Sequence, residues 1–204
     1  MARGKKMATS RKGKAPVPRR KKTLHIRSAK QVRALRTPLR QAIVQTLTGP
    51  GAYTVRELAD ELGHEPAALY YHVHALEEAG IVVETDRRKG GGRPEGVYAL
   101  VAERIIIDRT ETSKAFLSAL ADLQRSTLRT AERELTRAVE ARGDGGAREK
   151  ASPMLLRLTP RLSPRATAHA VKMIHELAEF LAKNDDPEAG ESYSLTAAFT
   201  RLVE

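Results

Sequence analysis

Residues 54–100, TVRELADELGHEPAALYYHVHALEEAGIVVETDRRKGGGRPEGVYAL, contain the local signals that indicate the fold. This stretch begins with Thr54 and Glu57 at capping-box spacing, where each side chain can satisfy a backbone amide near the other. Gly63 ends this short helix, and Pro66 then occupies the first position of another. A short helix, a tight turn and a second helix predict a helix-turn-helix.

The segments on either side of these helices complete the domain. Upstream, Thr37 and Pro38 are typical of the start of a further helix, which ends at a Gly/Pro turn. Downstream, the β-branched residues 81–86 and the residues 97–100 predict two strands joined by a basic, glycine-rich tip. Three helices followed by a two-stranded hairpin indicate a winged helix-turn-helix.

The second helix, residues 66–79, divides into a core face and an outer face. Leu69, Val73 and Leu76 form its inward stripe, which leaves tyrosine and histidine rings outside. Such rings can meet base edges or phosphates, and the arginines of the wing suit a narrow minor groove. The predicted DNA-binding residues are Thr54, Arg56, Ala67, Tyr70, Tyr71, His74, Arg87, Arg88, Lys89 and Arg93.

A metal site is a poor interpretation of these histidines. His72 and His74 are two residues apart, so on a helix they point about 200° away from each other. The chain has no cysteine, which also removes thiolate ligands, disulfides and thiol catalysis. His72 is therefore expected to be a hydrogen-bonded ring beside the core, and one of the two adjacent tyrosines can pack against the first helix. No cofactor is expected.

The positive charge is concentrated at the N-terminus. The net charge is +11, and residues 1–22 hold ten Lys and Arg and no acid. The remaining body is nearly neutral, and the tail, rich in Gly, Pro and Ala, cannot bury a core. We predict a disordered basic tail over residues 1–23. It acts either as a solubilising segment or as an arm that binds a polyanion with salt-dependent affinity.

The C-terminal half is predicted to be mainly helical. Residues 111–142 form a helix with an apolar stripe longer than a winged domain can cover, and Ser163 and Pro164 begin another helix. We expect the uncovered stripe to pack against this helix and a second subunit. The predicted dimerisation residues are Phe116, Leu120, Leu123, Leu177 and Leu181. Residues 147–162 remain unassigned, and residues 193–203 suit either a strand or a helix.

The segment quoted first resembles the winged-helix domain of bacterial ArsR-like transcriptional regulators, and the resemblance covers residues 37–102. YYHVHALEEAGIV, which begins at Tyr70, resembles the recognition helix of that family where it runs into the wing. The resemblance implies a homodimer that binds palindromic double-stranded DNA, with an unidentified small-molecule effector as a further partner. The cysteine motif of the metal-sensing members is missing, so metal sensing is not implied.

The predicted fold class is therefore mainly α (α+β), with a winged helix-turn-helix DNA-binding domain over residues 24–102 and a helical dimerisation or effector region over residues 103–204. The expected function is a sequence-specific transcriptional regulator, acting as a repressor in the cytoplasm at the nucleoid. The alternative is an architectural chromatin protein of low specificity. The sequence has no glycine-flanked nucleophile motif and no phosphate-binding loop, so an enzyme is not expected. No apolar stretch approaches the roughly 20 residues of a membrane span, so no membrane partner is expected.

Overall fold

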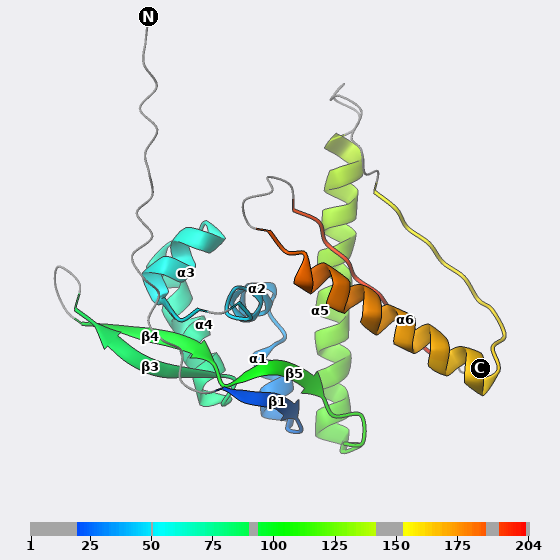
Figure 1. Ribbon diagram of the computed structural model, residues 1–204, viewed down its shortest axis with the longest axis horizontal. Coiled ribbons are helices and arrows are strands. Elements are labelled where there is room, and N and C mark those ends of the chain that lie inside the picture. The colour runs from blue at the N-terminus through cyan, green and yellow to red at the C-terminus, as the bar shows by residue number, and fades with distance from the viewer. Residues whose placement is uncertain (1–19, 50, 90–93, 142–152, 187–191, 203–204) are drawn as a thin grey trace, which may run out of the picture. The chain divides into compact units, whose positions relative to one another are not determined.

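The computed structural model describes residues 20–49, 51–89, 94–141, 153–186 and 192–202. The chain divides into two compact units, residues 1–127 and residues 128–204, which are considered separately below. The first unit holds all of the strands that the structure describes and most of the helices (Figure 1).

The helices of the first unit begin and end where local signals place them. Both capping boxes are formed, one by Ser28 with Gln31 and one by Thr54 with Glu57. Gly63 ends its helix in the left-handed conformation, with φ of 65°, which glycine adopts without steric cost. The four helices are α1 (Ala29–Ala34), α2 (Pro38–Thr46), α3 (Val55–Leu62) and α4 (Pro66–Glu78).

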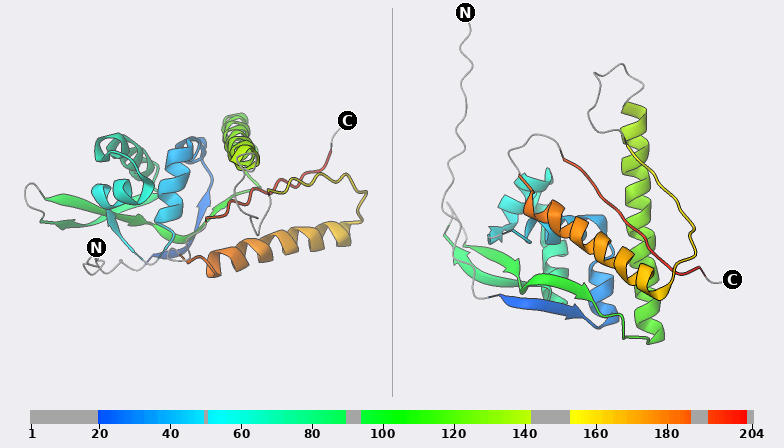
Figure 2. Two further views of the ribbon diagram at one scale, coloured as in Figure 1. Left: turned by 90° about the horizontal axis from the view of Figure 1, so that it is seen from above. Right: turned by 45° about the vertical axis from the view of Figure 1, so that its right-hand side comes forward.

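Two small sheets accompany these helices. A three-stranded antiparallel sheet has the order β2-β4-β3, and its β3-β4 hairpin projects beyond the helices as a wing (Figures 1 and 2). A separate parallel pair joins β1 and β5. The strands are β1 (Lys21–Ile26), β2 (Tyr53–Thr54), β3 (Val82–Arg88), β4 (Glu95–Leu100) and β5 (Ala102–Ile107). The predicted winged helix-turn-helix and the predicted α+β class are therefore confirmed.

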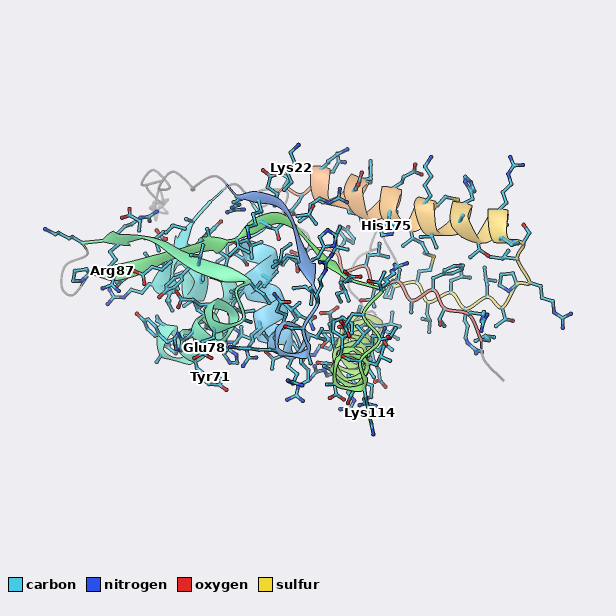
Figure 3. All side chains as sticks on the ribbon, turned by 90° about the horizontal axis from the view of Figure 1, so that it is seen from below. Lys22, Tyr71, Glu78, Arg87, Lys114 and His175 are labelled. Atoms are coloured by element: carbon cyan, nitrogen blue, oxygen red, sulfur yellow. The ribbon has the colours of Figure 1, made fainter. Side chains whose placement is uncertain are left out.

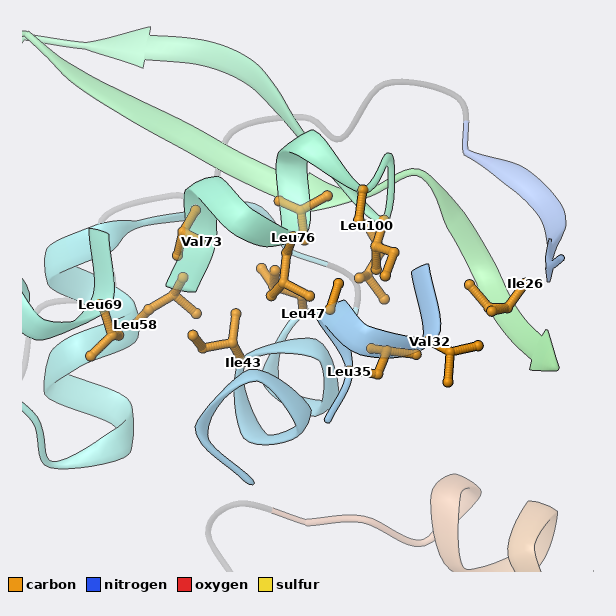
Figure 4. Close-up of a cluster of buried hydrophobic side chains, with 14 of the residues drawn as sticks. Ile26, Val32, Leu35, Ile43, Leu47, Leu58, Leu69, Val73, Leu76 and Leu100 are labelled. Atoms are coloured by element: carbon orange, nitrogen blue, oxygen red, sulfur yellow. The ribbon is translucent and has the colours of Figure 1, made fainter. Parts of the chain in front are cut away.

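One hydrophobic core lies between the helices and the hairpin (Figure 4). The predicted inward stripe of α4 is confirmed, since Leu69, Val73 and Leu76 are buried there. Ile43 from α2 and Leu58 from α3 pack in the same cluster. This packing fixes the rotation of α4 about its own axis and therefore decides which of its side chains face solvent.

The folded part of the chain begins earlier than the sequence suggested. Strand β1 begins at Lys21, inside the predicted tail. The Arg20 guanidinium donates to the carbonyl oxygens of Leu47, Gly49 and Gly51 at 3.3, 3.2 and 2.8 Å, and its burial lowers the Arg20 pKa. The predicted boundary at residue 23 is corrected to the neighbourhood of residue 20. A truncation meant to remove only the basic arm should end at residue 19, and that arm lies outside the described residues.

The predicted end of the winged-helix domain at residue 102 is also corrected. Strand β5 completes the pair with β1, and the long helix α5 (Lys114–Ala141) contributes its first turns to the first unit, which ends at Thr127. Phe116 and Leu123 are buried in the winged-helix core, and Leu120 packs against that core. The prediction that Phe116 and Leu123 contact a second subunit is wrong, because this core already covers them.

The second unit contains the end of α5 and the helix α6 (Pro164–Lys183). Ser163 caps α6 by accepting from the Ala166 amide, as expected. Residues 153–162 and 192–202 have neither helix nor strand, so the strand or helix considered near the C-terminus is absent from residues 193–202. The predicted end of α5 at residue 142 lies outside the described residues. No residue of α6 is buried, and no helix in the described ranges is long and apolar enough to cross a membrane.

Candidate nucleic-acid interface

Helix α4 presents an outer face with aromatic side chains. Tyr70 and Tyr71 are 50% and 71% exposed, and His74 and Ala67 are exposed beside them. Residues three and four apart share one side of a helix, so these four side chains form a single face. Figure 3 shows Tyr71 directed outward from α4. The face combines a small residue, which allows close approach, with phenol and imidazole groups that can donate or accept hydrogen bonds.

Arg40 on α2 contacts one edge of this face, although no pattern in the sequence singled it out. Its guanidinium carbon lies 5.6 Å from the centre of the Tyr71 ring, and its Nε donates to His72 Nδ1 at 3.3 Å. Burial and the adjacent Arg40 lower the pKa of His72, so near neutral pH its Nδ1 keeps the lone pair that accepts this bond. The expected packed, hydrogen-bonded His72 is confirmed, and Tyr71 is restrained by a neighbouring helix.

His74 lies between the outer face and two acids at the end of α4. Its Nδ1 is 3.4 Å from Glu77, and its Nε2 is 3.3 Å from Glu78. The exposed part of α4 therefore carries aromatic and imidazole groups and then carboxylates, without lysine or arginine. Attraction to phosphates must come from the neighbouring elements instead.

Helix α3 and the wing supply arginines that are paired with carboxylates. Arg56 on α3 lies 2.7 Å from Glu95 on β4, and Arg88 on β3 lies 2.7 Å from Glu57 on α3. These two pairs connect the wing to the first helix of the helix-turn-helix. The Arg88 side chain is only 27% exposed, so part of its length is packed rather than free to reach DNA.

The third pair lies within the wing. Arg87 Nε donates to Glu84 Oε1 at 2.6 Å, and this hydrogen bond raises the pKa of Arg87. Arg87 stays exposed on the hairpin, where Figure 3 labels it. Lys89 is exposed next to it. The carboxylates of these pairs were missed in the sequence because their partners lie on other elements or across a β-bulge between Glu84 and Asp86.

Two of the predicted DNA-binding residues, Thr54 and Arg93, are not placed on this exposed surface by the described structure. Thr54 is 6% exposed, and its hydroxyl accepts from the Glu57 amide in the capping box. Its predicted DNA contact is corrected, because the side chain is occupied in capping α3. Arg93 lies outside the described residues, so its contact stays a prediction. The remaining residues of the predicted interface lie on α3, α4 and the wing of one compact unit.

The comparison with known families agrees with this geometry. Residues 35–85 match a family described as a helix-turn-helix domain. These residues are similar to that family, and the match covers about a quarter of the chain. The matched residues run from the end of α1 through the helix-turn-helix to the middle of β3, and the structure adds the hairpin that makes the domain winged. The match and the fold together support a DNA-binding transcriptional regulator, whereas the finer ArsR-like assignment stays a prediction.

Several solved structures are similar to this winged-helix chain at low identity. Reduced HlyU from Vibrio cholerae is 22% identical, with 45% of this chain and 82% of that chain covered and a TM-score of 0.28. Rv0081 from Mycobacterium tuberculosis is 23% identical, with 56% and 90% covered and a TM-score of 0.30. A MarR family transcription regulator is 15% identical, with 77% and 81% covered and a TM-score of 0.26. No curated protein matches the chain significantly in sequence.

Proposed function

We propose that this protein is a sequence-specific DNA-binding transcriptional regulator that acts as a homodimeric repressor and has no enzymatic role. The observation that carries the proposal is the division of α4 into two faces. Its leucine and valine side chains are buried in the core, while Tyr70, Tyr71 and His74 are exposed together. A helix fixed in this way presents the same side chains to every duplex, which direct reading of base edges requires.

The wing and α3 would supply the contacts that position α4. Arginines and lysines beside a recognition helix bind phosphates and set its register on the duplex. Arg56, Arg87 and Lys89 are exposed at these places. The basic residues within residues 1–19 would add affinity that depends on salt but not on sequence.

The homodimer is supported by apolar surface in the second unit. On α6, Met173, Leu177, Phe180 and Leu181 are exposed, and a contiguous exposed apolar face commonly marks a protein-binding surface. A dimer would also place two recognition helices on one operator, about one helical turn of DNA apart. Leu177 and Leu181 therefore remain predicted dimer contacts. Leu120, which is only partly buried against the winged-helix core, also remains one. An effector that binds the second unit also remains a prediction.

The alternative, an architectural DNA-binding protein, predicts different binding. Such a protein would bind duplexes with little regard to sequence, mainly through phosphate contacts. The basic N-terminal residues suit both functions. The aromatic face of α4 favours the regulator, because it has chemistry for base edges and no lysine or arginine for phosphates.

Replacing Tyr70 or His74 with alanine should weaken specific binding much more than non-specific binding. We expect each change to cost about 1–3 kcal/mol on a sequence that the wild type selects, the usual cost of a lost base contact. Fluorescence anisotropy with that duplex and with a random-sequence duplex measures the difference. His25→Ala, which alters an exposed histidine on β1, is the matched control. An equal loss on both duplexes would show that α4 does not read sequence.

A further inference from the structure

Three arginines of the interface are paired with carboxylates within the folded protein. Arg56, Arg87 and Arg88 each donate to a glutamate at 2.6–2.7 Å. Outside residues 1–22 the chain has 26 basic and 25 acidic residues, whereas those 22 residues have ten basic residues and no acid. The net positive charge of the chain therefore comes almost entirely from residues 1–22.

We propose that Glu57, Glu84 and Glu95 are specificity-determining residues that compete with DNA phosphates for the interface arginines. This inference rests on the proposed DNA-binding function and adds to it a role for carboxylates. As a consequence, the basic N-terminal residues provide affinity for DNA of any sequence. The folded surface binds tightly only where α4 makes its base contacts.

The physical basis is the balance of charge at each arginine. A phosphate that approaches Arg87 also approaches the Glu84 carboxylate, which lies 2.6 Å from the same guanidinium. Repulsion from the carboxylate offsets much of the attraction to the arginine, so few counterions need to leave the DNA. Non-specific binding consists almost entirely of this electrostatic contribution, whereas the base contacts of α4 do not depend on it. The carboxylates therefore reduce non-specific affinity selectively.

A purely structural role for the same pairs predicts the opposite result. The Arg56–Glu95 and Arg88–Glu57 pairs connect α3 with the two strands of the wing. If their main effect were to hold the wing in position, loss of the carboxylate charge would leave the wing less well placed. Binding to every duplex would then weaken.

The experiment compares Glu84→Gln/Glu95→Gln with Glu103→Gln/Glu111→Gln in the full chain. Both pairs of substitutions remove two negative charges. Glu103 is exposed on β5, and Glu111 is partly exposed just before α5 in the same unit. Glu57→Gln is a third variant, because glutamine at this position still completes the capping box of α3. The probe is a labelled duplex of random sequence, titrated over a range of salt concentrations.

We expect Glu84→Gln/Glu95→Gln to bind the random duplex about tenfold more tightly at low salt. The slope of log affinity against log salt should steepen by about 1–2, since each newly available phosphate contact adds about 0.9. The control pair should change the affinity less than about twofold. Glu57→Gln should also bind more tightly while its thermal stability stays close to that of the wild type.

Two results would overturn the inference: equal effects of the two double variants, or weaker binding by Glu84→Gln/Glu95→Gln. Both leave the proposed function intact, provided that the wild type still prefers a selected sequence to the random duplex. A wild-type protein that binds no duplex would instead contradict the proposed function, and the inference with it.

Discussion

Replacing Leu123 with aspartate should unfold the winged-helix unit instead of separating two subunits. Leu123 lies on α5, is 9% exposed and packs in the same core cluster as Phe116 and Leu76. The change removes a buried leucine side chain and places an unpaired carboxylate among aliphatic groups. We expect a loss of about 4 kcal/mol or more in the free energy of unfolding, a large share of the roughly 5–15 kcal/mol that stabilises a typical domain.

Leu117→Asp is the matched control for this prediction. Leu117 lies on the same helix and in the same unit but is 48% exposed, so its replacement should alter stability by less than about 1 kcal/mol. Thermal and denaturant unfolding followed by circular dichroism measures both variants. A Leu123→Asp protein as stable as the wild type but with a lower sedimentation coefficient would show that Leu123 faces a partner subunit after all.

The double variant Leu177→Asp/Leu181→Asp should dissociate the proposed dimer. These side chains lie one turn apart on α6 and are exposed in the isolated chain. In a symmetric dimer every substitution occurs twice, so aspartates would enter the interface from both subunits. Burying unpaired charge there should cost at least about 3 kcal/mol, which raises the dimer dissociation constant more than about a hundredfold.

Ala168→Asp provides the comparison for the dimer. It adds a carboxylate to the same helix, nine residues from Leu177 and hence about 180° around the helix axis. Sedimentation velocity at micromolar concentration should give a dimer for the wild type and for Ala168→Asp, and a monomer for the double variant. The melting temperature of the winged-helix unit should be unchanged, because none of the core residues of that unit lies on α6. A double variant that remains dimeric would exclude this face as the interface.

The elements that could be predicted from the sequence are those with local signals. The capping box at Thr54, the left-handed Gly63 and the proline that begins α4 determine the helix-turn-helix within a few residues of chain. Helix α1 was missed, although Ser28 and Gln31 have the same capping-box spacing as Thr54 and Glu57. This helix was not predicted because it is short and its apolar residues form only a weak pattern.

The features that could not be predicted depend on contacts between distant residues. Strand β1 pairs with β5 across about 80 residues of sequence, from Lys21 to Ala102, and neither strand is stable alone. The stripe on α5 was visible in the sequence, but which half of it the winged-helix core covers depends on three-dimensional packing. The pairing of the interface carboxylates could not be predicted either, because Glu95 and Arg56 meet only when the wing folds back toward α3.

We propose that α4 reads DNA sequence as part of a two-fold symmetric protein. This claim can be tested by selecting duplexes from a random pool with the full wild-type chain and sequencing the bound fraction. We predict enrichment of an inverted repeat whose half-sites lie about 10 base pairs apart, and loss of that enrichment in Tyr70→Ala and His74→Ala. A bound pool with no enriched sequence, at salt concentrations where the protein still binds, would contradict the claim and favour an architectural role.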